Sequence, residues 1–361
     1  HITVDGKYLD SDVIPKPTIL FEPGTHSHQH GDGTTEPYKV RKNINSLSPF
    51  EMLSLARALK SMQADSSADG YQAIASFHAL PRLCPNPKSA ERYACCVHGM
   101  ATFPQWHRLY TVQFEDALRR HGSQVGIPYW DWLRPSKSLP PLLTISSIHD
   151  PINHMDIENP FLKAKIEFES LETERDVDSS KLFIQASYKN WFVQQALLAL
   201  EQENYCDFEI QFEILHNGVH SWVGGSKVHS MAHLHYASYD PAFYVHHAET
   251  DRLWAIWQKL QEFRGQDGSE SNCAIDLMKV PLKPFSFGSP YNLNSKTKEF
   301  SKPSDTFAYK ERYGYVYDSL DFMGLDTARL DSFIKEKQEG DRVFAGFLLK
   351  GFGSSASISF D

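Results

Sequence analysis

The sequence predicts a mainly helical domain followed by a short antiparallel β region. From residue 48 to about 262, apolar residues recur every three or four positions, which is the spacing of amphipathic helices. After residue 307 the pattern alternates instead, as in Tyr313, Tyr315 and Tyr317 and again over residues 356–360. Only three or four such strands precede the last residue, so we expect the β region to be incomplete.

The composition argues against two classes of protein. The chain has 36 basic and 45 acidic residues, a formal net charge of -9, so nucleic acid is not an expected partner. No apolar run approaches the roughly 18 residues that cross a bilayer, so no membrane span is expected. Aromatic residues make up 13% of the chain, which predicts a densely packed interior.

We expect three segments along the chain. Residues 1–45 are interpreted as a linker, because the stretch from 15 to 38 is rich in Pro, Gly, Thr and His, although Asp5-Gly6 is typical of a hairpin turn. The alternating histidines at 26, 28 and 30 have no rigid site around them and are interpreted as solvated. Residues 46–290 form the helical segment, and residues 291–361 form the partial β region.

Start signals locate the helices of the middle segment. Ser48 and Glu51 predict a capping box at the first helix, and Pro104 suits the first turn of the third. The other helices are expected over residues 68–78, 191–200, 208–220 and after Asp240-Pro241.

Histidines gather on the expected inward faces of these helices or beside them. His216 and His220 are four apart and share one helical face. Neutral imidazoles from separate helices are typical of a metal site inside a bundle, although any one of them alone is more often a core residue. The positions concerned are 78, 98, 107, 216, 220 and the doublet 246–247.

An all-nitrogen cluster favours copper or zinc. The zinc hydrolase pattern is absent, because residues 216–220 read HNGVH and carry no adjacent glutamate base. Six imidazoles, counting one of the 246–247 doublet, exceed the four that one tetrahedral zinc takes, so two metals with three imidazoles each fit the count better. A histidine-rich bundle stabilised by zinc remains the structural alternative.

Long motifs resemble those of type 3 copper proteins, most closely the functional units of molluscan haemocyanins. Residues 96–100 and 103–108 read CVHGM and FPQWHR, like the first copper motif, and residues 128–132 read PYWDW. Residues 216–220 and 240–254 resemble the second copper motif. The resemblance covers roughly residues 39–361 and implies a central four-helix bundle with two coppers, followed by a β-sandwich-like domain.

The resemblance also implies which histidines bind copper. Adjacent helical residues point roughly 100° apart, so His246 and His247 do not both face one copper well, and the family pattern selects His247. His246 is then expected to pack or to support a ligand, and the histidines at 229, 233 and 235 are expected to be structural. The implied ligands are His78, His98 and His107 for the first copper, and His216, His220 and His247 for the second.

The five cysteines acquire implied roles in the same way. An odd number leaves at least one cysteine outside any set of disulfides within the chain. The resemblance implies a thioether between Cys96 and His98, with a free buried Cys96 as the alternative. Disulfides fit an oxidising, extracellular setting, and the resemblance implies secretion into haemolymph. The implied disulfides are Cys84–Cys95 and Cys206–Cys273.

Two functions follow from the resemblance. The first is reversible O2 binding and transport, with O2 held as peroxide bridged between two copper ions, in one unit of a multi-unit respiratory protein that forms a large homo-oligomer. The second is an o-diphenol oxidase or tyrosinase-type enzyme that stays latent until the β domain is displaced. The copper chemistry is common to both, so access to the site separates them.

Further residues are candidates for the surroundings of the coppers. Phe243 is a candidate gate in an apolar wall with Trp106 and Trp254, each of which otherwise fits an ordinary core. Asp251 is a candidate acceptor for an imidazole N–H, with a salt bridge to Arg252 as the alternative. The last candidates are Glu213 and Asn217, which in an oxidase would orient a water near a phenol, against an ordinary helix-surface role for Glu213.

Overall fold

The computed structural model describes residues 27–29, 35–37, 39–81, 83–85, 92–134, 138–176, 186–266, 268, 282–285 and 301–351. The expected hairpin turn at Asp5-Gly6, Cys273 and the alternating segment 356–360 lie outside the described residues. Among the helices in the described ranges, none is long and apolar enough to span a bilayer.

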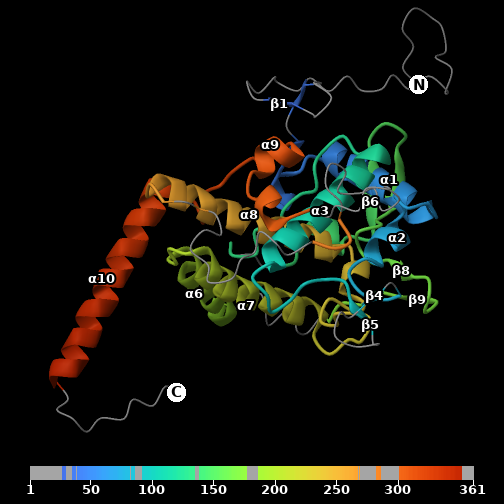
Figure 1. The fold of residues 1–361 in the computed structure, drawn as a ribbon. Helices are drawn as coiled ribbons and strands as arrows, with labels where there is room; N and C mark the ends of the chain where they lie inside the picture. Colours follow the sequence, from blue (N-terminus) through green and yellow to red (C-terminus); the bar gives the residue numbers. More distant parts are fainter. Residues whose placement is uncertain are drawn as a thin grey trace, which may run out of the picture.

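Helices form the body of the described chain, as the apolar spacing predicts. α3 packs against α8 near the centre, and α6 lies beside α7 (Figure 1). The expected helix over 68–78 is reduced to the five-residue α2, and the central four-helix bundle stays a prediction. The helices are α1 (Pro49–Ala64), α2 (Tyr71–Ala75), α3 (Phe103–Arg120), α4 (Pro141–Thr144), α6 (Ala186–Leu200), α7 (Tyr205–Gly224), α8 (Ala242–Phe263), α9 (Tyr309–Tyr313) and α10 (Thr327–Gly351), with short 3-10 helices at Ile44–Ser46, Ala237–Tyr239 and Pro303–Thr306.

The predicted start of α1 is confirmed. The Ser48 hydroxyl accepts from the Glu51 backbone N–H at 3.3 Å, and the Glu51 carboxylate accepts from the Ser48 backbone N–H at 2.8 Å. This reciprocal pair satisfies two N–H groups that have no partner within the helix. Asn204 caps α7 in a similar way, accepting from the backbone N–H of Asp207 at 2.8 Å.

The strands are short and pair in twos. β3 (Lys39–Arg41) and β10 (Tyr315–Tyr317) are parallel, so the first and last parts of the helical body meet there. The other described pairs are antiparallel. They are β1 (Ser27–Gln29) with β2 (Thr35–Pro37), β4 (Leu83–Pro85) with β5 (Arg92–Ala94), β6 (Ser147–Asp150) with β7 (Met155–Glu158), and β8 (Lys165–Ile166) with β9 (Leu171–Glu172).

The described part of residues 291–361 differs from the expected antiparallel region. The tyrosine alternation does produce β10, but its partner is β3, and the 25-residue helix α10 follows. Leu330 and Ile334 are four apart and both are buried, and Asp331 pairs with Lys335 at the same spacing. These pairs at helical spacing explain why the stretch after β10 forms a helix rather than another strand.

Aromatic side chains fill the interior, as their excess predicts. Trp106, Trp254 and Trp257 are fully buried. Helix α8 is buried at every position from 242 to 257, which is typical of a central helix. This burial places the histidine doublet of α8 in the core.

Candidate metal centre

The first group of imidazoles comes from the turn after α2, the segment before α3, and α3 itself. The ring centroids of His98 and His107 are 4.9 Å apart, and His78 lies 5.5 Å from His98 and 5.8 Å from His107. His78 and His107 are buried, and His98 is half-buried. The structure therefore brings together the three histidines implied for the first copper.

The second group is held by α7 and α8. The Nε2 atom of His247 lies 3.2 Å from Nε2 of His216 and 3.3 Å from Nε2 of His220. Helical spacing explains the convergence, because His216 and His220 are one turn apart on the face of α7 that meets α8. The structure therefore also brings together the three histidines implied for the second copper.

The two groups form one continuous cluster. The rings of His107 and His247 stack with centroids 4.7 Å apart and an interplanar angle of 12°. The rings of His98 and His216 are 6.1 Å apart. Because α3 packs directly on α8, the first and second groups face each other across that helix contact.

Backbone carbonyls fix three of these rings. Nδ1 of His107 lies 2.9 Å from the carbonyl oxygen of Phe103, one turn earlier in α3. Nδ1 of His78 and of His220 face carbonyl oxygens in one loop, that of Leu234 at 3.1 Å and that of Met231 at 2.9 Å. Because Nδ1 carries the donated proton, Nε2 is left as a lone-pair donor for a metal. The loop that contains His229, His233 and His235 therefore orients the imidazoles through its backbone carbonyls.

The donor set fits metal ions well. The Nε2 atoms of His78 and His107 are buried without a hydrogen-bond partner among the described residues. In the second group, Nε2 of His247 lies 3.2 Å from that of His216 and 3.3 Å from that of His220, although the proton of His220 is on Nδ1. Nitrogens roughly 2.0 Å from one tetrahedral ion lie about 3.3 Å apart, so this spacing suits a shared ion. The histidine groups fit a copper site.

Burial keeps all six imidazoles neutral, the form that binds metal. It is the largest cause of each shift, and it lowers the pKa of His98 to about 4 and that of His220 to about 3. Neighbouring imidazoles lower the pKa further at the most enclosed positions. The pKa lies well below its ordinary value for His78, His107, His216 and His247.

The candidate apolar wall is partly in place. Phe243 is fully buried, and its ring lies 4.1 Å from that of His247 and 5.0 Å from that of His78. Trp106 is also fully buried, 4.8 Å from the ring of His107. The Trp254 ring instead lies under the Arg108 guanidinium, 3.6 Å from its centroid, so it supports that charge.

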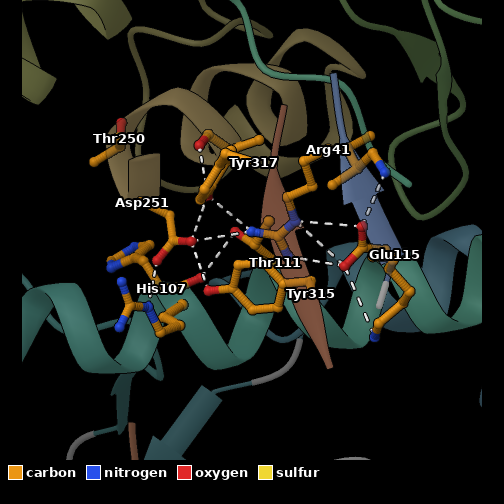
Figure 2. Close-up of polar contacts among 12 residues, drawn as sticks. Arg41, His107, Thr111, Glu115, Thr250, Asp251, Tyr315 and Tyr317 are labelled. Atoms are coloured by element: carbon orange, nitrogen blue, oxygen red, sulfur yellow. Dashed lines mark hydrogen bonds and ion pairs between the residues drawn. The ribbon is translucent and has the colours of Figure 1, made fainter. Parts of the chain in front are cut away.

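Asp251 lies in a buried ionic network rather than beside an imidazole (Figure 2). Its carboxylate accepts from Arg41 Nη1 at 3.0 Å, from the hydroxyls of Tyr315 and Tyr317, and from Arg108 Nε. The alternative partner, Arg252, pairs instead with Glu249 at 2.9 Å. The network joins β3 and β10 to the two helices that carry His107 and His247.

Glu213 and Asn217 line an open cavity of about 780 Å³ that reaches His98. The Glu213 carboxylate accepts from the Gly99 backbone N–H at 2.8 Å and is buried, so it does not have the expected helix-surface role. Sequence reasoning missed Glu209 in the same cavity. Burial and the charge of Glu213 raise the pKa of Glu209 to about 9. Its spacing of four residues from Glu213 was the available signal.

Cys96 is the free cysteine among the described side chains, and it is buried. Burial raises the pKa of its thiol to about 12. Its sulfur and one ring nitrogen each of His78 and His98 lie within 4.8 Å of one another. The thioether to His98 stays a prediction, with the two partners close together.

Comparison with known proteins connects this geometry to a family. The common central domain of tyrosinase matches residues 68–260. Hemocyanin type 2 unit e of Rapana venosa is 58% identical over 330 residues, which cover 91% of this chain and 80% of that protein. Hemocyanin 2 of Megathura crenulata is 64% identical over 99% of this chain, but the match covers only 11% of that protein.

Solved structures show the same fold. Deoxygenated hemocyanin from Rapana thomasiana superposes with a TM-score of 0.78 at 56% identity, over 84% of this chain and 75% of that one. A tyrosinase from Burkholderia thailandensis gives a TM-score of 0.63 at 19% identity, over 82% of this chain and 77% of that one, and so shares the fold alone. The chain belongs to the haemocyanin family, whose members are type 3 dicopper proteins.

Proposed function

We propose that this chain binds O2 reversibly at two copper ions and acts as one oxygen-carrying unit of a larger protein. One observation carries the proposal: the two imidazole groups meet face to face, with His107 stacked on His247 at 4.7 Å. Ligand sets in contact hold two ions close enough to act together on one small ligand. The relatives named as haemocyanins support the same reading.

Residues around the proposed copper ions orient the imidazoles and exclude water. When bound, the copper pair supplies the two electrons that O2 takes up reversibly. Carbonyl contacts at Nδ1 hold His78, His107 and His220 with Nε2 free for the metal. Phe243 and Trp106, both fully buried against the imidazoles, exclude water and therefore the protons that would make O2 uptake irreversible.

Assembly and secretion belong to the same proposal. The Megathura relatives are about ten times longer than the matched region, and the Rapana relative is named as a unit, so we propose neighbouring units as partners. Residues 46–290 hold all six ligands and serve as the copper domain in this scheme. Disulfides Cys84–Cys95 and Cys206–Cys273 would suit an extracellular setting. β4 contains Cys84 and pairs with β5, which ends one residue before Cys95.

Oxidation of o-diphenols is the second candidate function. The cavity of about 780 Å³ supports it, because it leads from the surface to His98 past Glu213 and Asn217. A phenol entering there would meet a carboxylate already held by the Gly99 N–H. In this scheme Phe243, which contacts the rings of His78 and His247, is the gate that limits access. A covering β domain would keep the activity latent.

Absorbance under cycles of O2 and vacuum tests the first function. Copper-loaded protein should gain a near-ultraviolet band with O2 and lose it under vacuum, and His107→Ala should abolish the band. Full copper loading with no band would overturn the proposal. Catechol added last separates the second function, because quinone formation shows that substrate reaches the coppers. Peptide mass spectrometry of the same sample reports the Cys96–His98 crosslink and the disulfides.

A further inference from the structure

We propose that His246 is a fourth imidazole of the second site and lets that site hold a divalent ion such as Zn2+ in closed, four-coordinate geometry. The inference rests on the ligand set of the proposed function and goes beyond oxygen binding. Three imidazoles leave a metal with an open position, which O2 requires, whereas a fourth closes it. The second site would then have two arrangements, selected by the metal.

His246 is placed for this role. Its side chain is fully buried, and neither ring nitrogen makes a hydrogen bond of regular geometry among the described residues; the nearby His216 backbone carbonyl opposes only part of the burial that lowers the pKa of His246. Buried polar atoms without a partner are rare in folded proteins, so we expect the His246 ring to contact a bound ligand or ion. One ring nitrogen each of His216, His220, His246 and His247 lies within 4.8 Å of the others.

The ring contacts show that His246 lies beside the other three imidazoles of the second site. The centroid of His246 lies 5.0 Å from that of His216, 4.7 Å from that of His220 and 5.1 Å from that of His247. Adjacent helical residues point apart, but the rings of His216 and His220 on α7 contact both His246 and His247. Four tetrahedral ligands need nitrogens about 3.3 Å apart, so a rotation of the His246 ring has to close the remaining distance.

A bound water is the competing explanation for the two bare nitrogens. The indole Nε1 of Trp132 is also buried without a partner among the described residues, and its ring lies 6.1 Å from that of His246. A water between them would satisfy one donor and one acceptor. This arrangement predicts no change in the metal coordination when His246 is replaced, so the two explanations are separable.

Cobalt spectroscopy on the full chain tests the proposal. Co2+ replaces Zn2+, and its visible absorption is several-fold stronger in four-coordinate than in five- or six-coordinate geometry. One equivalent of Co2+ added to metal-free native protein should give the strong four-coordinate band, unchanged by added thiocyanate because no position is open. In H246Q a water takes the fourth position, so thiocyanate should replace it and shift the band. The control is H233Q, which changes an exposed histidine of the neighbouring loop and should leave the band intact. The same comparison in an H107A background removes the contribution of the first site.

Two further measurements keep the result independent of folding. Circular dichroism compares the variants, and H246C should again exclude thiocyanate and add a sulfur-to-cobalt band. X-ray absorption of the Zn2+ form should count four imidazoles in native protein and three in H246Q. Identical Co2+ spectra for native protein and folded H246Q would overturn the proposal. Failure of native protein to bind Co2+ would refute the ligand set itself, and with it the proposed function.

Discussion

Asp251→Ala should destabilise the fold strongly, because two buried guanidinium groups meet at this carboxylate. Arg41 donates to it at 3.0 Å and Tyr315 at 2.6 Å, and Arg108 donates through Nε (Figure 2). Arg41 keeps a second acidic partner, Glu115, at 2.9 Å. The charge left uncompensated is therefore mainly that of Arg108.

The magnitude follows from these contacts. Removing one partner of a buried ion pair costs about 3–5 kcal/mol. The Tyr315 hydroxyl also loses its acceptor, which adds about 1–3 kcal/mol. Arg108 retains a neutral acceptor, the Thr306 carbonyl at 2.8 Å, which favours the lower end of the range. A loss of about 4–6 kcal/mol is a large part of the roughly 5–15 kcal/mol that stabilises a typical domain.

Urea unfolding of the metal-free protein, followed by tryptophan fluorescence, measures the effect. The control is Asp69→Ala, which also removes an aspartate from an arginine, Arg120, but in a pair whose side chains are 41% and 42% exposed. Exposed pairs contribute about 0.2–1 kcal/mol. Asp251→Asn keeps one carbonyl acceptor and should fall between the two. Equal losses for Asp251→Ala and the control would refute the reasoning.

Three other changes follow from the same structure. Below about pH 6.5 the metal-free protein should lose stability steeply, because the unfolded chain binds protons that the buried, pKa-lowered imidazoles do not, at about 1.4 kcal/mol per pH unit for each imidazole. A urea midpoint that stays constant from pH 7.5 to 5.5 would contradict this. Ser48→Ala should cost about 1 kcal/mol in thermal unfolding through loss of the cap, and no change would mean that the capping box is not stabilising. Phe243→Ala should cost about 3–5 kcal/mol and should make the O2-dependent band fade over successive vacuum cycles; a stable band would remove Phe243 from the apolar wall.

Local spacing predicted most helices and the shared helical face of His216 and His220, whereas the ligand set was implied by the family resemblance and stays a prediction. His216 and His220 share a helical face wherever that helix packs, and a capping box at Ser48 involves only neighbouring residues. The pairing of Lys39–Arg41 with Tyr315–Tyr317 was not predictable in this way, because periodicity gives a strand but not its distant partner. The strand pattern therefore predicts a sheet after residue 307, where the structure instead has one strand followed by the helix α10.

The buried network shows a second limit of sequence reasoning. An aspartate one turn after His247 is a reasonable candidate to orient an imidazole. Which donors reach that carboxylate, however, depends on the positions of β3, β10 and α3. The same holds for Glu209, whose raised pKa arises from burial beside Glu213 rather than from its sequence position.

Orientation of the imidazoles depends on the main chain more than on side chains. The carbonyls of Met231 and Leu234 belong to one short loop, yet they hold His220 of the second group and His78 of the first. Every residue has a backbone carbonyl, so residue type does not reveal which carbonyls accept these hydrogen bonds. The sequence therefore drew attention only to the histidines of this loop. Because one loop orients one imidazole of each group, its conformation ties the two groups together. This arrangement suits the proposed function, in which two metals act on the same O2.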